Sequence, residues 1–118
     1  MTLDPQTIKH YWTAHPTANI ALQTGEKSGI VVVDLDIRPG VNGIREWNRK
    51  IDTLASTSAR GGIHLFYRWT RYIGTRLDPA RGIDIFGDRT GSIIVPPSTV
   101  EGVMYQWIND LPMIDFQF

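Results

Sequence analysis

The run Ile30-Val31-Val32-Val33-Asp34-Leu35-Asp36 predicts the central strand of the domain. It is β-branched and almost wholly apolar, which favours a strand that is buried on both faces. Two aspartates lie at its C-terminal end. Because side chains alternate along a strand, Asp34 and Asp36 project from the same face of the sheet. Carboxylates in such a setting are costly unless they are paired or bound to a cation.

A third carboxylate has a similar setting. Asp84 lies between Ile83 and Ile85 in a predicted strand, so it faces away from these two apolar neighbours. Three oxygen ligands on one sheet face would form a Mg²⁺ or Mn²⁺ site, and two such ions about 3.5–4 Å apart are the usual device for phosphoryl transfer. The alternatives are incidental charge at a strand end for the first two aspartates, and for Asp84 a structural ion pair with Arg81 or Arg89.

His64 follows two glycines at the start of another predicted strand, Ile63 to Trp69. Gly61 and Gly62 allow the backbone to approach a ligand closely, and their N–H groups can bind an anion. We therefore expect His64 to donate a hydrogen bond to a phosphate oxygen, with Arg60 supplying positive charge. The alternative is a structural histidine that serves only to satisfy hydrogen bonds.

The remaining patterns predict an α+β domain that spans residues 1–118. A short helix begins at Asp4-Pro5 and ends at His15-Pro16, and Asn42 caps a second helix that carries Ile44, Trp47, Ile51 and Leu54. Further strands are predicted at residues 20–22, 92–95 and 105–107, with a polar connector at residues 71–81. Most strands lie in the second half of the chain.

Composition excludes several classes of protein. The 118 residues include 12 Lys+Arg, 12 Asp+Glu and no Cys, which excludes a histone-like basic chain, a disulfide scaffold, a cysteine nucleophile and a Cys-ligated zinc site. No apolar run approaches the roughly 20 residues of a membrane helix, and no secretory leader is recognisable. We expect a protein with no membrane partner, located in the cytoplasm.

Basic residues are unevenly distributed. Nine of the 12 are Arg, and the stretch from Arg45 to Arg76 holds seven basic residues against two acidic ones. Arginine favours bidentate contacts with phosphate, so this stretch indicates a nucleic-acid or nucleotide surface beside the acidic residues. The alternative is an ordinary solvated surface.

Taken together, several short motifs resemble the catalytic domain of the primase-polymerases, the bifunctional DNA primase/polymerase N-terminal domain of the archaeo-eukaryotic primase superfamily. The similarity covers roughly residues 12 to 107. The matching segments, in the family's order, are His15 to Ile20, Thr24-Gly25, Ser28 to Asp36, Arg60 to Arg68, Gly82 to Ile85, Gly87-Asp88, Val95 to Ser98 and Tyr105-Gln106-Trp107.

This resemblance implies a two-layer, primase-like α+β fold. Its mixed sheet would have one half like an RNA-recognition module, with the active site in the cleft between the layers. It also implies a metal-dependent nucleotidyltransferase that acts as a DNA-templated primase or polymerase in replication or repair. The expected context is prokaryotic, plasmid or viral replication. The expected partners are nucleoside triphosphates, single-stranded or primed DNA, and a helicase or accessory helical domain.

The resemblance also implies roles for individual residues. Asp34, Asp36 and Asp84 would bind two Mg²⁺ or Mn²⁺ ions and, with His64, form the catalytic set. The loop Ser58, Arg60, Gly61 and Gly62 would hold the triphosphate together with His64, and Asn19 would line the nucleotide pocket. Phe86 stands where the family often has Arg, so Arg38 or Arg89 is expected to supply that phosphate contact. Arg68, Arg71 and Arg76 would contact the DNA template.

Two other functions remain open from the sequence. One is a degenerate or truncated relative that binds nucleotide or single-stranded DNA without catalysis, although the intact three carboxylates and His64 argue against such decay. A metal-dependent nuclease or phosphohydrolase would use the same acidic cluster, although no obvious general base other than His64 supports it.

Overall fold

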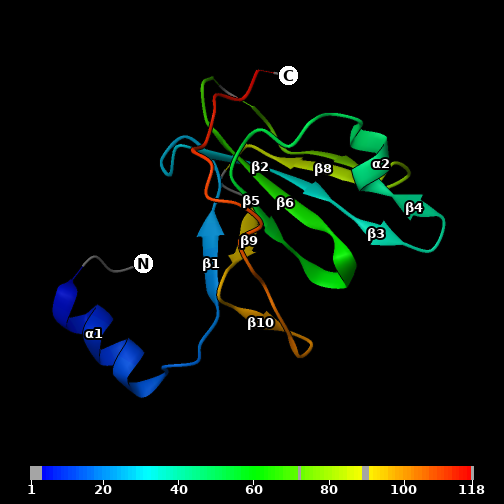
Figure 1. The fold of residues 1–118 in the computed structure, drawn as a ribbon. Helices are drawn as coiled ribbons and strands as arrows, with labels where there is room; N and C mark the ends of the chain where they lie inside the picture. Colours follow the sequence, from blue (N-terminus) through cyan, green and yellow to red (C-terminus); the bar gives the residue numbers. More distant parts are fainter. Residues whose placement is uncertain (1–3, 72, 89–90, 118) are drawn as a thin grey trace.

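An antiparallel five-stranded sheet forms the centre of the protein (Figure 1). The computed structural model describes residues 4–71, 73–88 and 91–117, so Arg89 lies outside the described residues. Across the sheet the strands are β5 (Ala55–Thr57), β6 (Ile63–Arg68), β2 (Ile30–Leu35), β8 (Ile83–Phe86) and β7 (Arg76–Asp78). The apolar run at residues 30–35 is therefore the central strand, as predicted.

The expectation of a mixed sheet is wrong, because every strand pairing within this sheet is antiparallel. Parallel neighbours need a crossover of a dozen or more residues. Here the turn 79–82 joins β7 directly to β8, and the turn 58–62 joins β5 to β6. Such short connections allow only antiparallel pairing. The α+β class itself is confirmed by the central sheet and the few helices.

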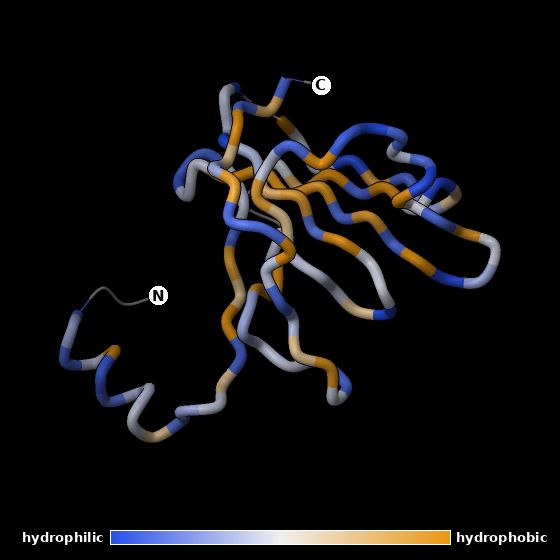
Figure 2. The backbone as a smooth tube through the Cα atoms, in the orientation of Figure 1, coloured by the Kyte–Doolittle hydropathy of each residue, from blue (hydrophilic) through white to orange (hydrophobic). Residues whose placement is uncertain are grey.

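The sheet has an apolar core on one face and a smaller apolar cluster on the other. Val31, Val33 and Leu35 of β2 belong to the larger core, together with Trp47 of the helix α2 (Gly43–Trp47). Val32 projects to the opposite face and packs with Phe66 and Ile93. Hydrophobic segments accordingly follow the central strands (Figure 2). Asp34 projects from the same face as Val32, so the face with the smaller cluster is the one that carries the aspartates.

The remaining elements surround this sheet. Strand β1 (Ile20–Gln23) pairs with β9 (Ser92–Val95), and two further pairs are β3 (Ile37–Arg38) with β4 (Val41–Asn42) and β10 (Thr99–Val100) with β11 (Val103–Met104). The helix α1 (Pro5–Ala14) lies apart from the sheet (Figure 1). Asp4 caps it by accepting hydrogen bonds from the N–H groups of Gln6 and Thr7, as its position before Pro5 predicts.

No helix within the described parts of the chain has the length and apolar character needed to cross a membrane.

The second helix is much shorter than predicted. It ends at Trp47, because Asn48 adopts a left-handed conformation with φ 49°. Ile51 packs against the larger core and Leu54 against the cluster on the other face of the sheet. Side chains on one side of a helix pack against only one face of a sheet. A helix that continued to Leu54 could not bring these two residues to opposite faces, so the helix ends before them.

Two other expectations about local structure are wrong. The predicted connector at residues 71–81 contains the edge strand β7, whose residues Arg76 and Leu77 are exposed and therefore lack an apolar pattern. The predicted strand at residues 105–107 is instead an irregular segment, in which Trp107 makes an isolated β-bridge with Ser56.

Candidate functional site

Five side-chain positions form a single row across the sheet. Asp34 is the register partner of His64 on β6 and of Asp84 on β8, and His64 is in turn opposite Ser56 on β5. Residues directly opposite each other on adjacent strands project from the same face. The row therefore runs Ser56, His64, Asp34, Asp84 and Leu77 from β5 to β7.

The three aspartates meet at this row. Asp34, Asp36 and Asp84 each offer one carboxylate oxygen, and these three oxygens lie within 4.8 Å of one another. All three residues are half-buried. The predicted convergence of the three carboxylates is confirmed by the structure, and the arrangement can hold a metal ion.

The cluster raises the pKa of Asp36. This pKa rises from 3.8 to about 6, and the largest cause is burial of the carboxyl group. The charge of Asp34, a hydrogen bond between the two carboxyls and the charge of Asp84 raise it further, whereas Arg38 lowers it. One oxygen of Asp34, Oδ1, is enclosed and has no hydrogen-bond partner among the described residues. Like charges held together and an unsatisfied carboxylate oxygen both fit a divalent cation, which prefers such hard oxygen ligands.

Neighbouring groups hold two of the aspartates in place. Oδ1 of Asp84 accepts a hydrogen bond from the backbone N–H of Asp78 at 3.0 Å. Nη1 of Arg38 lies 3.4 Å from Oδ2 of Asp36, and the Arg38 guanidinium also donates to the carbonyl of Pro79.

The alternative partner considered for Asp84 is engaged elsewhere. Arg81 lies beside Glu46 and Asp78, with nitrogen–oxygen distances of 3.7 Å in both pairs. Among the described residues, Asp84 is therefore held by a backbone N–H group and surrounded by carboxylates, which supports a cation-binding role rather than a structural ion pair with Arg81.

His64 is buried beside the cluster. Its side chain is 8% exposed, and Nε2 lies 3.3 Å from Oδ1 of Asp34. The ring packs edge-on against Phe66 and Tyr105, with centroid distances of 6.4 and 6.1 Å. His64 is therefore enclosed by aromatic rings, with Nε2 beside the carboxylate of Asp34.

The loop before β6 brings a basic side chain to the same region. Residues Ala59–Gly61 form a short 3-10 turn in which Arg60 has φ 58°. Gly62 is required by close packing, because a Cβ there would lie 2.6 Å from Oγ of Ser58 and 2.7 Å from the carbonyl of Leu35. The Gly62 N–H already donates to the carbonyl of Ala59 at 3.1 Å, so it is not available to an anion in this conformation.

These groups line one pocket of about 140 Å³. It combines carboxylates with basic side chains, a mixture that suits a phosphate–metal complex. The lining residues are Asp34, Asp36, Ile37, Arg38, Ser58, Ala59, Arg60, His64 and Tyr105.

Asn19 lies elsewhere. It lines a separate hollow of about 220 Å³ with Pro97 and Ser98. Both ends of its side-chain amide are engaged with Thr99, since Nδ2 donates to the Thr99 carbonyl at 2.8 Å and Oδ1 accepts from the Thr99 N–H at 2.9 Å. The structure therefore gives Asn19 a role in fixing the chain near the Pro96-Pro97 turn and does not bring it to the acidic pocket.

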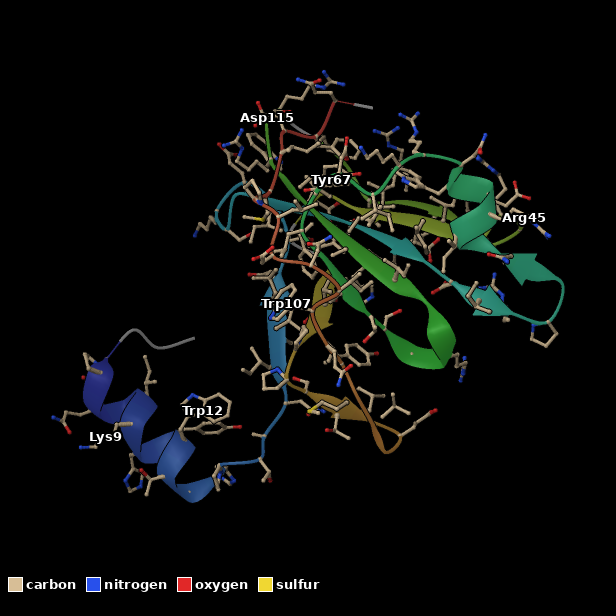
Figure 3. All side chains as sticks on the ribbon, viewed as in Figure 1. Lys9, Trp12, Arg45, Tyr67, Trp107 and Asp115 are labelled. Carbon is tan, nitrogen blue, oxygen red and sulfur yellow. The ribbon has the colours of Figure 1, made fainter. Side chains whose placement is uncertain are left out.

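The three arginines expected to contact DNA are exposed. Arg68 lies at the end of β6 remote from His64, where Nε donates to Oδ1 of Asp115 at 2.7 Å. Asp115 lies at the end of the sheet away from β3 (Figure 3). Arg76 is on the edge strand β7, and Arg71 follows β6.

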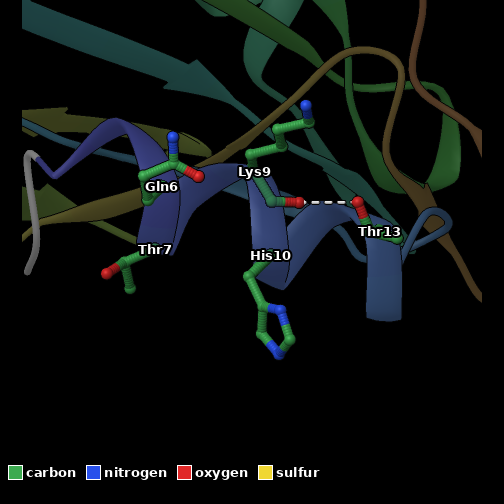
Figure 4. Close-up of a pocket in the computed structure, with 5 residues that line it drawn as sticks. All are labelled: Gln6, Thr7, Lys9, His10 and Thr13. Atoms are coloured by element: carbon green, nitrogen blue, oxygen red, sulfur yellow. Dashed lines mark hydrogen bonds between the residues drawn. The ribbon is translucent and has the colours of Figure 1, made fainter.

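Another hollow, on α1, is remote from this chemistry. It has about 530 Å³ and is lined by Gln6, Thr7, Lys9, His10 and Thr13 of α1 (Figure 4). None of these residues carries a carboxylate, so the hollow lacks the acidic ligands that the other pocket offers to a divalent cation.

Two residues beside the pocket, Ser56 and Tyr105, were not predicted from the sequence to belong to the site. The Tyr105 hydroxyl accepts a hydrogen bond from the Ala59 N–H at 3.1 Å, which anchors the loop above the pocket. The motif Tyr105-Gln106-Trp107 was a signal for this residue. Ser56 lies eight residues before His64, with the Gly61-Gly62 turn between them, and only the strand register reveals that the two are opposite.

Comparison with known proteins gives one match. The sequence model of the family described as bifunctional DNA primase/polymerase, N-terminal, matches residues 1–115, nearly the whole chain. No match is found among curated proteins.

Proposed function

Because the chain belongs to the bifunctional DNA primase/polymerase N-terminal family, we propose that it is a metal-dependent nucleotidyltransferase that extends or starts a nucleic-acid strand on a DNA template. The observation that carries the proposal is the meeting of three carboxylate oxygens within 4.8 Å, beside a buried histidine, in a chain of this family.

In the proposed reaction, the 3′-hydroxyl oxygen forms a bond to the α-phosphorus of a nucleoside triphosphate, and the hydroxyl proton passes to solvent. The bond from this phosphorus to the bridging oxygen breaks, and pyrophosphate leaves. Asp34, Asp36 and Asp84 would hold two Mg²⁺ or Mn²⁺ ions, which supply activation of the attacking oxygen and charge neutralisation of the leaving group. The chain's own contribution is to position the reactants and to stabilise charge.

Basic residues around the pocket would bind the triphosphate. Nε2 of His64 is placed to donate to a phosphate oxygen, and the guanidinium groups of Arg38 and Arg60 supply positive charge in the same pocket. Arg38 thereby takes the place of the arginine that Phe86 replaces. The buried hydroxyl of Ser58 contributes to the same loop.

Exposed arginines would contact the template. Arg71 and Arg76 are the stronger candidates, because Arg68 is engaged with Asp115. If Arg76 contacts a phosphate, Arg76→Ala should reduce the slope of log affinity against log salt by about 1. An unchanged slope would exclude Arg76 from the DNA interface.

Extension of a labelled primer on a DNA template tests the proposed activity. With Mn²⁺ or Mg²⁺ and nucleoside triphosphates, the parent should extend the primer, and Asp34→Asn and Asp84→Asn should reduce extension by at least about a hundredfold. Asp110→Asn, a change at an exposed carboxylate outside the cluster, is the matched control and should extend like the parent. Equal extension by all four proteins would exclude the proposed site.

A further inference from the structure

Two enclosed polar atoms belong to residues that are register partners in the row that contains the active-site histidine. Oγ of Ser56 and Nδ1 of His64 both lack a hydrogen-bond partner among the described residues. Ser56 is 0% exposed and the His64 side chain is 8% exposed, so bulk water cannot satisfy them. Buried polar atoms are costly unless they are paired, and each such case requires an explanation.

The strand register places these two residues directly opposite each other. The Phe66 N–H donates to the Leu54 carbonyl and the Ser58 N–H donates to the Gly62 carbonyl, at 2.9 and 3.0 Å. Hydrogen-bonded pairs recur every two residues along an antiparallel ladder, so Ser56 and His64 form the hydrogen-bonded pair between them, with Cα atoms about 5.5 Å apart. Their side chains therefore share one face, within reach of a direct bond or one bridging water.

The tautomer of the His64 imidazole determines which of the two atoms, Nδ1 of His64 or Oγ of Ser56, donates the missing hydrogen bond. Nε2 lies 3.3 Å from Oδ1 of Asp34, and a carboxylate so near favours a proton on Nε2. In a neutral imidazole Nδ1 is then an acceptor and needs a donor. The hydroxyl of Ser56 is the donor that the register supplies.

We infer that Ser56 is a positioning residue for His64. Its hydroxyl donates to Nδ1, either directly after rotation about the Cα–Cβ bond or through one enclosed water, and thereby fixes the ring orientation with the Nε2 proton directed into the acidic pocket. The consequence for substrate rests on the proposed function: a ring held in this way presents a ready donor to a triphosphate oxygen.

Nitrogen NMR of the metal-free protein tests the hydrogen bond without any activity. The chain has three histidines, so a His10→Gln/His15→Gln background leaves His64 as the only signal. The parent should show a proton on Nε2 and a hydrogen-bonded Nδ1. Ser56→Ala should shift the Nδ1 resonance toward the value of an unbonded nitrogen, while Ser56→Thr should keep it.

Thr57→Val is the matched control, because it removes a hydroxyl from the neighbouring position of β5 that accepts from the Gln106 N–H. It should leave the Nδ1 resonance unchanged. A proton on Nδ1 in the parent would overturn the inference even if Ser56→Ala fails to fold. An identical Nδ1 resonance in parent and Ser56→Ala would overturn it as well.

Binding of a nonhydrolysable nucleoside triphosphate with Mn²⁺ tests the functional consequence. Ser56→Ala should weaken binding by about three- to tenfold, the usual effect of one hydrogen bond, and Ser56→Thr should bind nearly as the parent does. Equal affinities in parent and Ser56→Ala would overturn the positioning role. If the parent itself binds no nucleotide while its Nδ1 is hydrogen-bonded, the proposed function fails and the Ser56–His64 bond stands.

Discussion

At the scale of single residues, the burial and mutual repulsion of the clustered carboxylates lower the stability of the metal-free protein. Asp36 is the clearest example, because burial and the charges of Asp34 and Asp84 disfavour its ionised form. A bound cation would reverse this penalty by supplying opposite charge. Removal of the Asp36 charge should therefore stabilise the metal-free protein and at the same time weaken cation binding.

Asp36→Asn tests both effects, on stability and on cation binding. At pH 8 in a chelator, its melting temperature should exceed that of the parent, because one like-charge repulsion is gone. Added Mn²⁺ should raise the melting temperature of the parent and of Asp110→Asn, but raise that of Asp36→Asn much less. Thermal unfolding with and without Mn²⁺ is the measurement, and a parent-like Mn²⁺ shift in Asp36→Asn would contradict the assignment.

The pH dependence of stability follows from the raised pKa. Asp36 binds its proton more tightly in the folded chain, with a pKa of about 6, than at the ordinary value of 3.8. Its contribution to the free energy of unfolding is thus most favourable below pH 4 and is lost as the pH rises to about 6.

Chemical unfolding of the metal-free protein between pH 4 and 7 measures this contribution. The difference in unfolding free energy, parent minus Asp36→Asn, should become more negative as the pH rises through this window. A difference that stays constant would show that the Asp36 carboxyl titrates normally in the folded protein.

Some of these residues could be predicted from the sequence alone. The two-residue period of strands places Asp34 and Asp36 on one face, and the apolar neighbours Ile83 and Ile85 turn Asp84 outward. Ser56 could not be predicted in the same way. Its position opposite His64 depends on the register of a hairpin whose turn contains the left-handed Arg60, and sequence patterns do not specify that register.

At the scale of elements, a junction of backbone hydrogen bonds holds the end of β2. The Asp36 N–H donates to the Gly82 carbonyl, and the Gly43 N–H at the start of α2 donates to the Asp36 carbonyl, both at 2.8 Å. A Cβ on Gly43 would lie 2.2 Å from the Gly82 carbonyl oxygen and 2.8 Å from the Asp36 nitrogen. The position of Asp36 thus depends on glycine at the start of α2.

Gly43→Ala should therefore disturb the proposed metal site as well as the fold. We expect a loss of about 1–3 kcal/mol in unfolding free energy from overpacking, together with weaker Mn²⁺ binding at a temperature where the variant is still folded. Gly40→Ala is the control. Its φ of 77° makes alanine unfavourable, but nothing lies within 4 Å of its Cβ position, so Mn²⁺ affinity should be unchanged. Equal Mn²⁺ affinities in parent and Gly43→Ala, measured by titration calorimetry, would show that the junction does not position Asp36.

Elements with a strong apolar pattern were predictable, and elements without one were not. The buried strands β2, β6 and β9 follow the sequence pattern closely, whereas β7 is an exposed edge strand with no apolar alternation. The length of α2 was overestimated because Ile51 and Leu54 have helical spacing but pack on opposite faces of the sheet. The mixed sheet was expected from family resemblance, but all four strand pairings of the central sheet are antiparallel.

At the scale of the whole molecule, α1 is set apart from the sheet that carries the site. All its residues are exposed, and its aromatic side chains contact each other or His15, as in the pair of Tyr11 and Trp12 with ring centroids 5.4 Å apart. Figure 3 shows Trp12 on this separate helix. The helix therefore adds little buried surface to the fold.

Removal of residues 1–14 should accordingly leave the core intact. We expect the unfolding free energy to change by about 0.5 kcal/mol or less, the scale of surface changes, and the Mn²⁺-induced rise in melting temperature to persist. Circular dichroism should lose helical signal while the unfolding transition stays cooperative. A truncated chain without a cooperative transition would show that α1 contributes to the core after all.

Anomalous diffraction from a crystal soaked with Mn²⁺ and a nonhydrolysable nucleoside triphosphate would locate both the metal ions and the nucleotide. We expect manganese peaks bounded by the carboxylates of Asp34, Asp36 and Asp84, with triphosphate oxygens against Nε2 of His64. Manganese bound only at other carboxylates, or a triphosphate bound away from His64, would contradict it.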